Sequence, residues 1–266
     1  MKKTIYTFAM MMLLNAMFLL NAQLIKNDFM DGLQINDPVE KGVYLTGDEP
    51  IMKNQWNLFD QELISGWPPA PGNSPLTVSP LTYSGYIDSG KGNAMKLEKI
   101  TGGGRRTVYS LDDGDSYKLA SYYISFLINV DKSTTSDRIG VLGFSGSPNG
   151  GFIRGVLTVT NFMPGTSYKL GISDINGGGS LLPTVCKYGE TYLVVLKYDL
   201  NEQVISCFVN PSITATEPTP TGQITKRDSF SALNYVRGIA VFQREDFAAT
   251  LGSFRFAESW EGAVLL

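Results

Sequence analysis

The chain has 266 residues, a formal net charge of −3 at pH 7 and no histidine. Its mild acidity, without a run of basic residues, excludes nucleic acid as an expected partner, and the lack of histidine excludes Ser-His-Asp and Cys-His catalytic sites. Only 18% of the residues are charged, while 11% are aromatic and 28 are glycine. This composition is typical of an all-β globule rather than of a disordered chain or a helical bundle.

Residues 1–22 have the pattern of a secretory signal peptide. Two lysines follow Met1, an apolar run covers residues 8–20, and Ala22 offers a small residue for cleavage. The apolar run is shorter than the roughly 20 residues of a membrane-spanning helix, so a retained anchor is the less favoured alternative. No cysteine lies directly after the apolar run, which disfavours a lipoprotein anchor there. The sequence therefore predicts an exported protein (periplasmic, on the cell surface or secreted) with no transmembrane segment after cleavage.

Residues 23–53 form an expected N-terminal extension. Turn-prone pairs such as Asp37-Pro38 separate short apolar pieces, so this extension is expected either to pair as an edge strand or to stay mobile. Regular strands are expected from residue 54, and residues 54–266 are expected to form one domain. A loop at 65–75 contains four prolines and two glycines, which exclude regular structure there.

Strand-like runs then recur about every 10–15 residues, separated by turn-forming residues, as in β-sandwiches and barrels. No stretch keeps helical periodicity across three turns, which disfavours a parallel sheet with interleaved helices. In the run 121–130, one face carries Tyr122, Ile124, Phe126 and Ile128. The expected strands are 54–59, 76–83, 93–100, 105–111, 121–130, 139–144, 155–160, 168–173, 191–198, 203–209, 236–243 and 249–256.

The clearest local signal is a β-hairpin at 191–211, in which two apolar runs flank the polar tetrapeptide 199–202. Pro211 ends the second run, because proline cannot donate to a ladder. Apolar residues on both faces of that run predict an interior strand covered on each side. The following segment, 212–229, is rich in Thr, Pro and Ser and is expected to be a surface crossover between sheets.

The two cysteines, Cys186 and Cys207, are an even number in an exported chain, so a disulfide between them is one alternative. If Asp199 and Glu202 face each other in the hairpin, Cys207 lies opposite Val194, and a bridge requires the chain before the hairpin to fold back. Two free, part-buried thiols are therefore favoured, since unpaired cysteine often behaves as a small core residue. Two cysteines without histidine fall short of a structural zinc site.

Several short motifs occur one after another along the chain. They are WNLFD at 56–60, LTYSGY at 81–86, GNA at 92–94, YYISFL at 122–127, the hairpin followed by TEP at 216–218, and GSFRFAESW at 252–260. With these motifs the chain resembles the LamG-like, concanavalin A-like jelly-roll domains of secreted bacterial proteins. The resemblance implies an antiparallel β-sandwich of two sheets with the first and last strands as neighbours. It implies little chemistry, because this architecture hosts lectins, adhesive modules, glycanases and lyases.

Hydrolases of this architecture carry three acids at alternate positions of one strand, where their carboxyl groups converge. Asp60 and Glu62 are the nearest match here, but Ile64 occupies the third position, so a polar strand end is favoured. Glu245 and Asp246 are adjacent and are expected to be solvated turn residues.

Lyases of this architecture use tyrosine as the base while arginine holds the carboxylate of a uronic acid. Arg105, Arg106, Tyr109 and Arg154 are the right residue types. The arginine–glutamate–arginine and histidine strand motifs that accompany this chemistry are absent, which disfavours a lyase.

The acidic turn at 111–116 offers oxygen ligands for calcium from Asp112, Asp113 and Asp115. It lacks EF-hand spacing, so an ordinary acidic turn is favoured and no cofactor is expected. The three glycines at 102–104 are expected to form a hairpin turn, because no helix follows to bind phosphate.

Carbohydrate binding uses exposed aromatic rings that stack on sugars, with nearby amides for the hydroxyls. Trp67 in the proline-rich loop is the first candidate, followed by Tyr83 and Tyr86, although burial of Trp67 at the end of the sandwich is the favoured alternative. Trp56 and Trp260 lie in the expected terminal strands and are predicted core residues.

The leading hypothesis is an exported, non-catalytic β-sandwich that binds a glycan or another surface partner. One alternative is a carbohydrate-active enzyme, either a glycoside hydrolase or a polysaccharide lyase. The other is a structural or assembly subunit without a small ligand.

Overall fold

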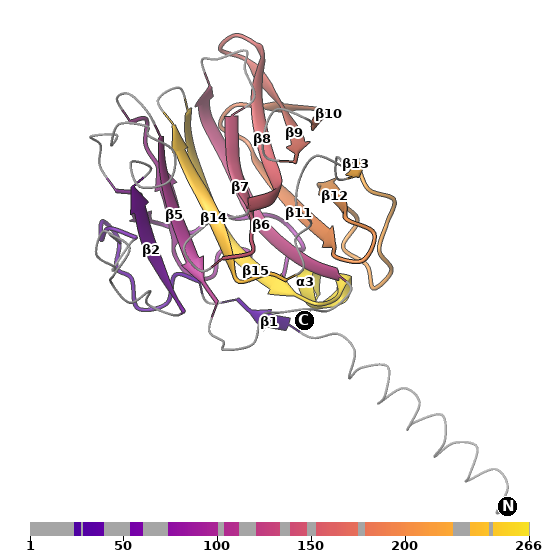
Figure 1. Ribbon diagram of the computed structural model, residues 1–266. Helices are drawn as coiled ribbons and strands as arrows, with labels where there is room; N and C mark the ends of the chain where they lie inside the picture. The colour runs from indigo at the N-terminus through magenta and orange to yellow at the C-terminus, as the bar shows by residue number, and fades with distance from the viewer. Residues whose placement is uncertain are drawn as a thin grey trace, which may run out of the picture.

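The computed structural model (Figure 1) describes residues 24–27, 29–39, 54–60, 74–100, 104–111, 121–133, 139–147, 153–174, 179–225, 235–244 and 247–265. The expected signal peptide at 1–22 lies outside these residues. In the part of the chain that is described, no helix has both the length and the apolar character needed to cross a membrane.

Two antiparallel β-sheets pack face to face around a common core (Figure 1). Sheet I has the strand order β13 (Gly222–Thr225), β12 (Val204–Val209), β11 (Thr191–Asp199), β6 (Ser121–Ser133), β15 (Phe247–Ala257), β4 (Ala94–Leu97) and β3 (Leu76–Val78), and β1 (Leu24–Lys26) also pairs with β15. Sheet II has the strand order β10 (Gly179–Lys187), β9 (Ser167–Ser173), β8 (Ile153–Met163), β7 (Ile139–Ser145), β14 (Gly238–Arg244), β5 (Gly104–Ser110) and β2 (Gln55–Asp60). This arrangement confirms the expected all-β, two-sheet antiparallel sandwich.

The two ends of the described chain meet in sheet I. Leu24 and Lys26 of β1 pair with Ala257 and Phe256 of β15, so the first and last strands are neighbours, as expected. The extension pairs as a strand and also contributes to the interior. Its buried apolar side chains, which belong to the main core, are Phe29, Met30, Leu33 and Val39.

Side-chain alternation along β6 separates an inner face from an outer face. Tyr122, Ile124, Phe126 and Ile128 point into the core between the sheets, on the face that the sequence pattern predicted. The ring of Phe126 stacks on that of Phe254 from β15, with centroids 5.8 Å apart. This layer of aromatic and branched residues joins the sheets through burial of apolar area.

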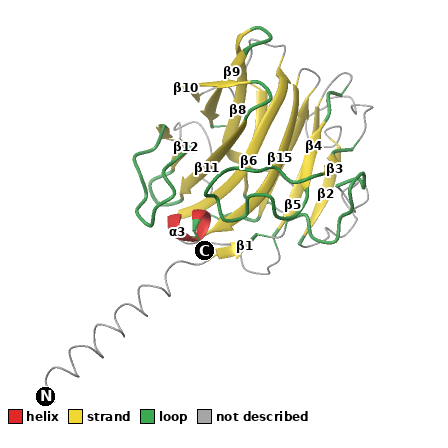
Figure 2. Cartoon of the chain, turned by 180° about the vertical axis from the view of Figure 1, so that it is seen from behind, coloured by secondary structure: helices red, strands yellow, loops and turns green. Residues whose placement is uncertain are grey.

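A third layer covers the outer face of sheet I. It is built from the loop after β3, the segment after β12 and the short helix α3 (Trp260–Val264), and Figure 2 shows these loops crossing in front of the sheet. Ser259 caps α3, because its side chain accepts a hydrogen bond from the Gly262 N–H. Trp260 packs on Phe208 and Tyr123 of the sheet. This face is therefore occupied by the chain itself.

The hairpin of β11 and β12 forms, but its expected register was wrong. Asp199 pairs with Val204, so Cys207 lies opposite Leu196 rather than Val194. The Asp199 carboxylate accepts hydrogen bonds from the backbone N–H groups of two loop residues, at 3.0 and 2.9 Å. Gln203 then takes a left-handed φ of 54°. These two features lengthen the loop and shift the second strand.

Two strands were not predicted. β10 contains Pro183 and is interrupted by a bulge between Leu181 and Val185, which is how an edge strand accommodates proline. β13 lies within the segment expected to be a crossover loop and pairs with β12. β12 is consequently an interior strand, with Cys207 in the core and Phe208 on the outer face, as its apolar pattern predicted.

Candidate functional site

A bulge in β15 places the buried residue Ser253 beside a hollow. The pairing of β15 with β6 is interrupted between Gly252 and Arg255, so Ser253 and Phe254 occupy the length of one residue of β6. Ser253 has a φ of 52°, a left-handed conformation that costs free energy for a residue with a side chain. Bulges commonly redirect side chains near functional sites.

The hollow has a volume of about 270 Å³ and is lined by three segments that are distant in sequence. One wall is the bulge, the second is the loop at 91–93, and the third is the N-terminal segment, through residues 27 and 29–33. Its polar lining residues are Asn27, Asp31, Lys91, Asn93 and Ser253, and its apolar ones are Phe29, Met30, Leu33 and Phe254. An apolar surface with a few amide, charged and hydroxyl groups is the usual composition of a small-molecule site.

Two anchors hold the N-terminal segment against the sandwich. The Phe29 ring lies 4.5 Å from that of Tyr109, and the Phe29 carbonyl accepts a 2.8 Å hydrogen bond from the indole of Trp56. Further along, the Leu33 carbonyl accepts a 2.8 Å hydrogen bond from the amide of Asn93. The third wall of the hollow is therefore positioned by the core and by a neighbouring loop.

A second hollow of about 310 Å³ is lined by the same segment. It shares Phe29, Asp31 and Leu33 with the first hollow and adds Asn54 and Gln55 as polar lining residues. Asp31 therefore borders both hollows.

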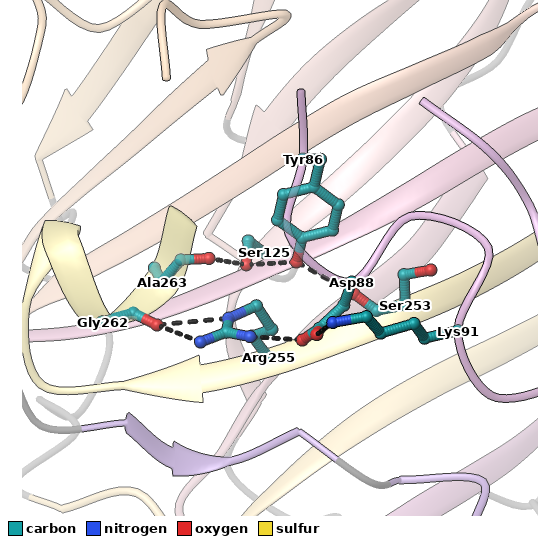
Figure 3. A network of polar contacts seen from close by, with 8 residues as sticks. All are labelled: Tyr86, Asp88, Lys91, Ser125, Ser253, Arg255, Gly262 and Ala263. Atoms are coloured by element: carbon teal, nitrogen blue, oxygen red, sulfur yellow. Dashed lines mark hydrogen bonds and ion pairs between the residues drawn. The ribbon is translucent and has the colours of Figure 1, made fainter. Parts of the chain in front are cut away.

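The hydroxyl of Ser253 is the most informative group in the site. The residue is only 6% exposed, and its Oγ has no hydrogen-bond partner among the residues that the structure describes. Its carbonyl, in contrast, lies 2.9 Å from the Tyr86 hydroxyl, and its side chain points away from the Arg255–Asp88 pair (Figure 3). A buried hydroxyl without a partner costs about 1–3 kcal/mol. A polar ligand in the hollow would remove that cost.

Replacement of Ser253 by alanine is expected to leave the free energy of unfolding unchanged or to raise it by up to about 1 kcal/mol, because it removes an unsatisfied buried hydroxyl. The matched control is Ser259→Ala, which removes a serine that caps α3 and is expected to cost about 0.5–2 kcal/mol. Urea unfolding of both variants checks the difference. A loss above about 1 kcal/mol in Ser253→Ala would show that the hydroxyl serves stability.

Below the hollow, a buried ion pair supports the bulge and the C-terminus (Figure 3). Arg255 is completely buried and pairs with Asp88. Its Nε and Nη2 donate to the Gly262 carbonyl at 3.2 and 3.0 Å. Lys91, which lines the hollow, lies 3.7 Å from the other oxygen of Asp88. The ion pair thus joins the hollow to α3.

Tyr86 and Ser125 form a second buried polar contact in the same layer (Figure 3). Their hydroxyl oxygens are 2.8 Å apart, and the Ser125 Oγ lies 2.5 Å from the Ala263 carbonyl. The hydroxyl groups of Tyr86 and Ser125 supply two protons for three contacts: the contact between them, the one to the Ala263 carbonyl and the one to the Ser253 carbonyl. At any moment, one of these three contacts is therefore a close approach without a hydrogen bond. Burial raises the pKa of Tyr86 far above its ordinary value, and the residue stays neutral.

The aromatic residues proposed from the sequence to bind a sugar differ in how far the structure buries them. Tyr86 is 3% exposed and packs with Leu127 and Leu193, so the expectation that its ring is presented to a sugar was wrong. Tyr83 packs at the edge of the same cluster and is half-buried, and burial raises its pKa. Trp67 lies outside the described residues and stays a prediction. Trp56 and Trp260 are buried, as predicted.

Three of the candidate lyase residues have described side chains, Arg106, Tyr109 and Arg154, and they do not converge on one site. Tyr109 points into the core and donates a hydrogen bond to the Asn54 carbonyl, whereas Arg106 points to the outer face of β5. Arg154 is buried and lies 3.4 Å from Asp174. The structure therefore does not bring Tyr109 together with Arg106 and Arg154. For Arg105 and Asp60 the structure describes only the backbone.

The remaining acidic candidates are Glu62, Asp112, Asp113, Asp115, Glu245 and Asp246, and all of them lie outside the described residues. Among the residues that are described, no group of three or more potential metal ligands is present. Cys186 and Cys207 are free and buried in the core. Burial raises the pKa of the Cys186 thiol to about 12.

The sequence did not predict that these residues form one site. Asn93 lies within the GNA motif and Ser253 within the closing motif, but neither was proposed to bind a ligand. The bulge that isolates the Ser253 hydroxyl has no signature in the sequence.

No protein-family model matches this chain, and no curated protein sequence matches it. Among solved structures, the chain is similar to a sialidase, with 11% identity, a TM-score of 0.46 and coverage of 79% of this chain and 17% of that protein. A carbohydrate esterase from a Shiga toxin-encoding bacteriophage has 10% identity, a TM-score of 0.46 and coverage of 84% and 98%. Winged bean acidic lectin, complexed with methyl-alpha-D-galactose, has 16% identity, a TM-score of 0.41 and coverage of 78% and 94%.

Proposed function

We propose that this chain is an exported, non-catalytic carbohydrate-binding protein of the LamG-like type, and that it binds its glycan in the hollow beside Ser253. The observation that carries the proposal is the buried Ser253 hydroxyl without a partner, which lines a hollow with apolar and polar walls. Sugar hydroxyls both donate and accept hydrogen bonds, and their C–H faces pack on apolar surface. Export rests on the signal-like pattern of residues 1–22.

The lining residues suit a neutral or singly charged sugar. Asn27 and Asn93 supply amides that donate and accept, Asp31 accepts, and Lys91 donates. The second hollow extends this surface past Asp31 towards Gln55. A glycan of two or more units is therefore expected to bind more tightly than its single sugar, because it contacts both hollows.

Glycan-array binding followed by calorimetry on the protein expressed from the full chain tests this function. Ser253→Ala is expected to weaken binding of the best glycan by about 3–10-fold, the equivalent of one neutral hydrogen bond. Ser212→Ala changes an exposed serine after β12 and is the matched control, with unchanged affinity. If no glycan binds, or if Ser253→Ala binds as tightly as the parent protein, the hollow is not a glycan site.

A further inference from the structure

Asp31 is an exposed acidic residue on the N-terminal segment, and it lines both hollows. Within the described part of the chain, its carboxylate forms neither an ion pair nor a hydrogen bond. An ionised carboxylate accepts hydrogen bonds and donates none. The segment that lines both hollows therefore presents a negative charge that is open to a ligand.

The two lysines that line the hollows, in contrast, already have partners. The ammonium of Lys91 in the first hollow lies 3.7 Å from a carboxylate oxygen of Asp88 (Figure 3). The ammonium of Lys26 in the second hollow lies 5.9 Å from the centroid of the Tyr109 ring. Positive charge at these walls is thus in contact with a carboxylate or an aromatic ring, whereas the negative charge of Asp31 is in contact with no cation.

The other two walls of the first hollow each supply an oxygen acceptor. In the loop at 91–93, the side-chain nitrogen of Asn93 donates to the Leu33 carbonyl, which leaves its Oδ1 as an acceptor for a ligand. On the bulge, the Ser253 Oγ is the acceptor. Together with the Asp31 carboxylate, the three walls offer one acceptor each. An ammonium group donates three hydrogen bonds and accepts none, so its chemistry matches this set.

We propose that the ligand of these hollows is an amino sugar with a free ammonium group, such as glucosamine, and that Asp31 binds this ammonium. The inference rests on the proposed function, because it names the class of glycan that the Ser253 hollow takes. A hydrogen bond from an ammonium to a carboxylate is stronger than one between neutral groups. Acetylation of the amine removes the charge and leaves a single N–H donor, so the N-acetylated sugar binds less tightly.

Calorimetry on the protein expressed from the full chain tests the inference with trimers of glucosamine, N-acetylglucosamine and glucose, at a pH at which the amine is protonated. The glucosamine trimer is expected to bind about 5–10-fold more tightly than the other two, and added salt is expected to reduce this preference. Asp31→Asn is expected to remove the preference. Asp37→Asn is the matched control and is expected to keep it, because Asp37 lies on the same segment, bonds the Gln34 N–H and lines neither hollow.

Thermal unfolding of the same variants guards against misfolding. Asp31→Asn is expected to melt at the temperature of the parent protein, because an exposed residue without a partner contributes little to stability. A lower melting temperature with loss of all three trimers would make Asp31 a structural residue, which overturns the inference.

Two further results would contradict the inference and leave the proposed function standing, provided that Ser253→Ala still weakens binding. The first is a glucosamine trimer that binds no more tightly than its N-acetylated form, or a preference that persists in Asp31→Asn. The second is tighter binding of trigalacturonate, an acidic trimer, which would assign the charge of the ligand to the Lys91 wall. Absence of binding by every glycan would overturn both the inference and the proposed function.

Discussion

Replacing Arg255 with leucine is expected to lower the free energy of unfolding by about 3–5 kcal/mol, because it leaves the carboxylate of Asp88 buried without its partner. Arg255 is completely buried, and it also satisfies the Gly262 carbonyl through two N–H groups. The same substitution therefore breaks the support of the bulge and of α3 together. Urea unfolding measures the loss, and thermal unfolding is expected to shift down by about 6–20 °C.

Lys91→Ala is the matched control for this experiment. Lys91 contacts the same carboxylate, but its side chain is 66% exposed, and an exposed pair of this kind contributes only about 0–1 kcal/mol. The double variant Arg255→Leu, Asp88→Leu is expected to be less destabilised than the sum of the two single variants, since neither charge is then left alone. Equal losses in Lys91→Ala and Arg255→Leu would contradict the assignment of the buried pair as the main support.

Truncating Trp260 to alanine is expected to cost about 3–5 kcal/mol, because the indole is the largest side chain that α3 lays on sheet I. Its ring lies 4.9 Å from that of Phe208 and 6.5 Å from that of Tyr123, and its Nε1 donates to the Thr214 carbonyl at 2.8 Å. Removal leaves a cavity beneath the helix and a carbonyl without its donor. Calorimetric unfolding measures the effect.

Trp260→Phe separates packing from hydrogen bonding. It keeps most of the apolar contact and loses the Nε1 donor, so a cost of about 1–3 kcal/mol is expected. If Trp260→Ala unfolds at the same temperature as the parent protein, α3 does not stabilise the outer layer, and the view of sheet I as a covered face is wrong.

Arg255→Leu and Trp260→Ala both test the third layer that covers the outer face of sheet I. The outer face of sheet I is covered by the chain's own third layer, through Arg255, Trp260 and Tyr86. Ligand binding is accordingly proposed elsewhere, in the hollow beside Ser253. The Arg255–Asp88 pair links stability to this hollow, because Lys91 contacts Asp88 and also lines the hollow.

The sequence by itself determined the strand character of this chain and the inward face of its best strand. Alternation with a period of two is a local property, so Tyr122, Ile124, Phe126 and Ile128 could be placed in the core before any partner strand was known. The position of the hairpin and the burial of Trp56 in a terminal strand were also predicted from the sequence. Trp260 is buried as predicted, but it lies in α3 and not in the expected terminal strand.

Only the tertiary structure decided where the binding groups are. The hollow joins residues near 30, 92 and 253. Which strands become neighbours, and in what register, depends on long-range packing that a local pattern does not specify. The bulge at Ser253 shows the reason most clearly: a single extra residue in a ladder, without any mark in the surrounding sequence, redirects one hydroxyl and creates the candidate site.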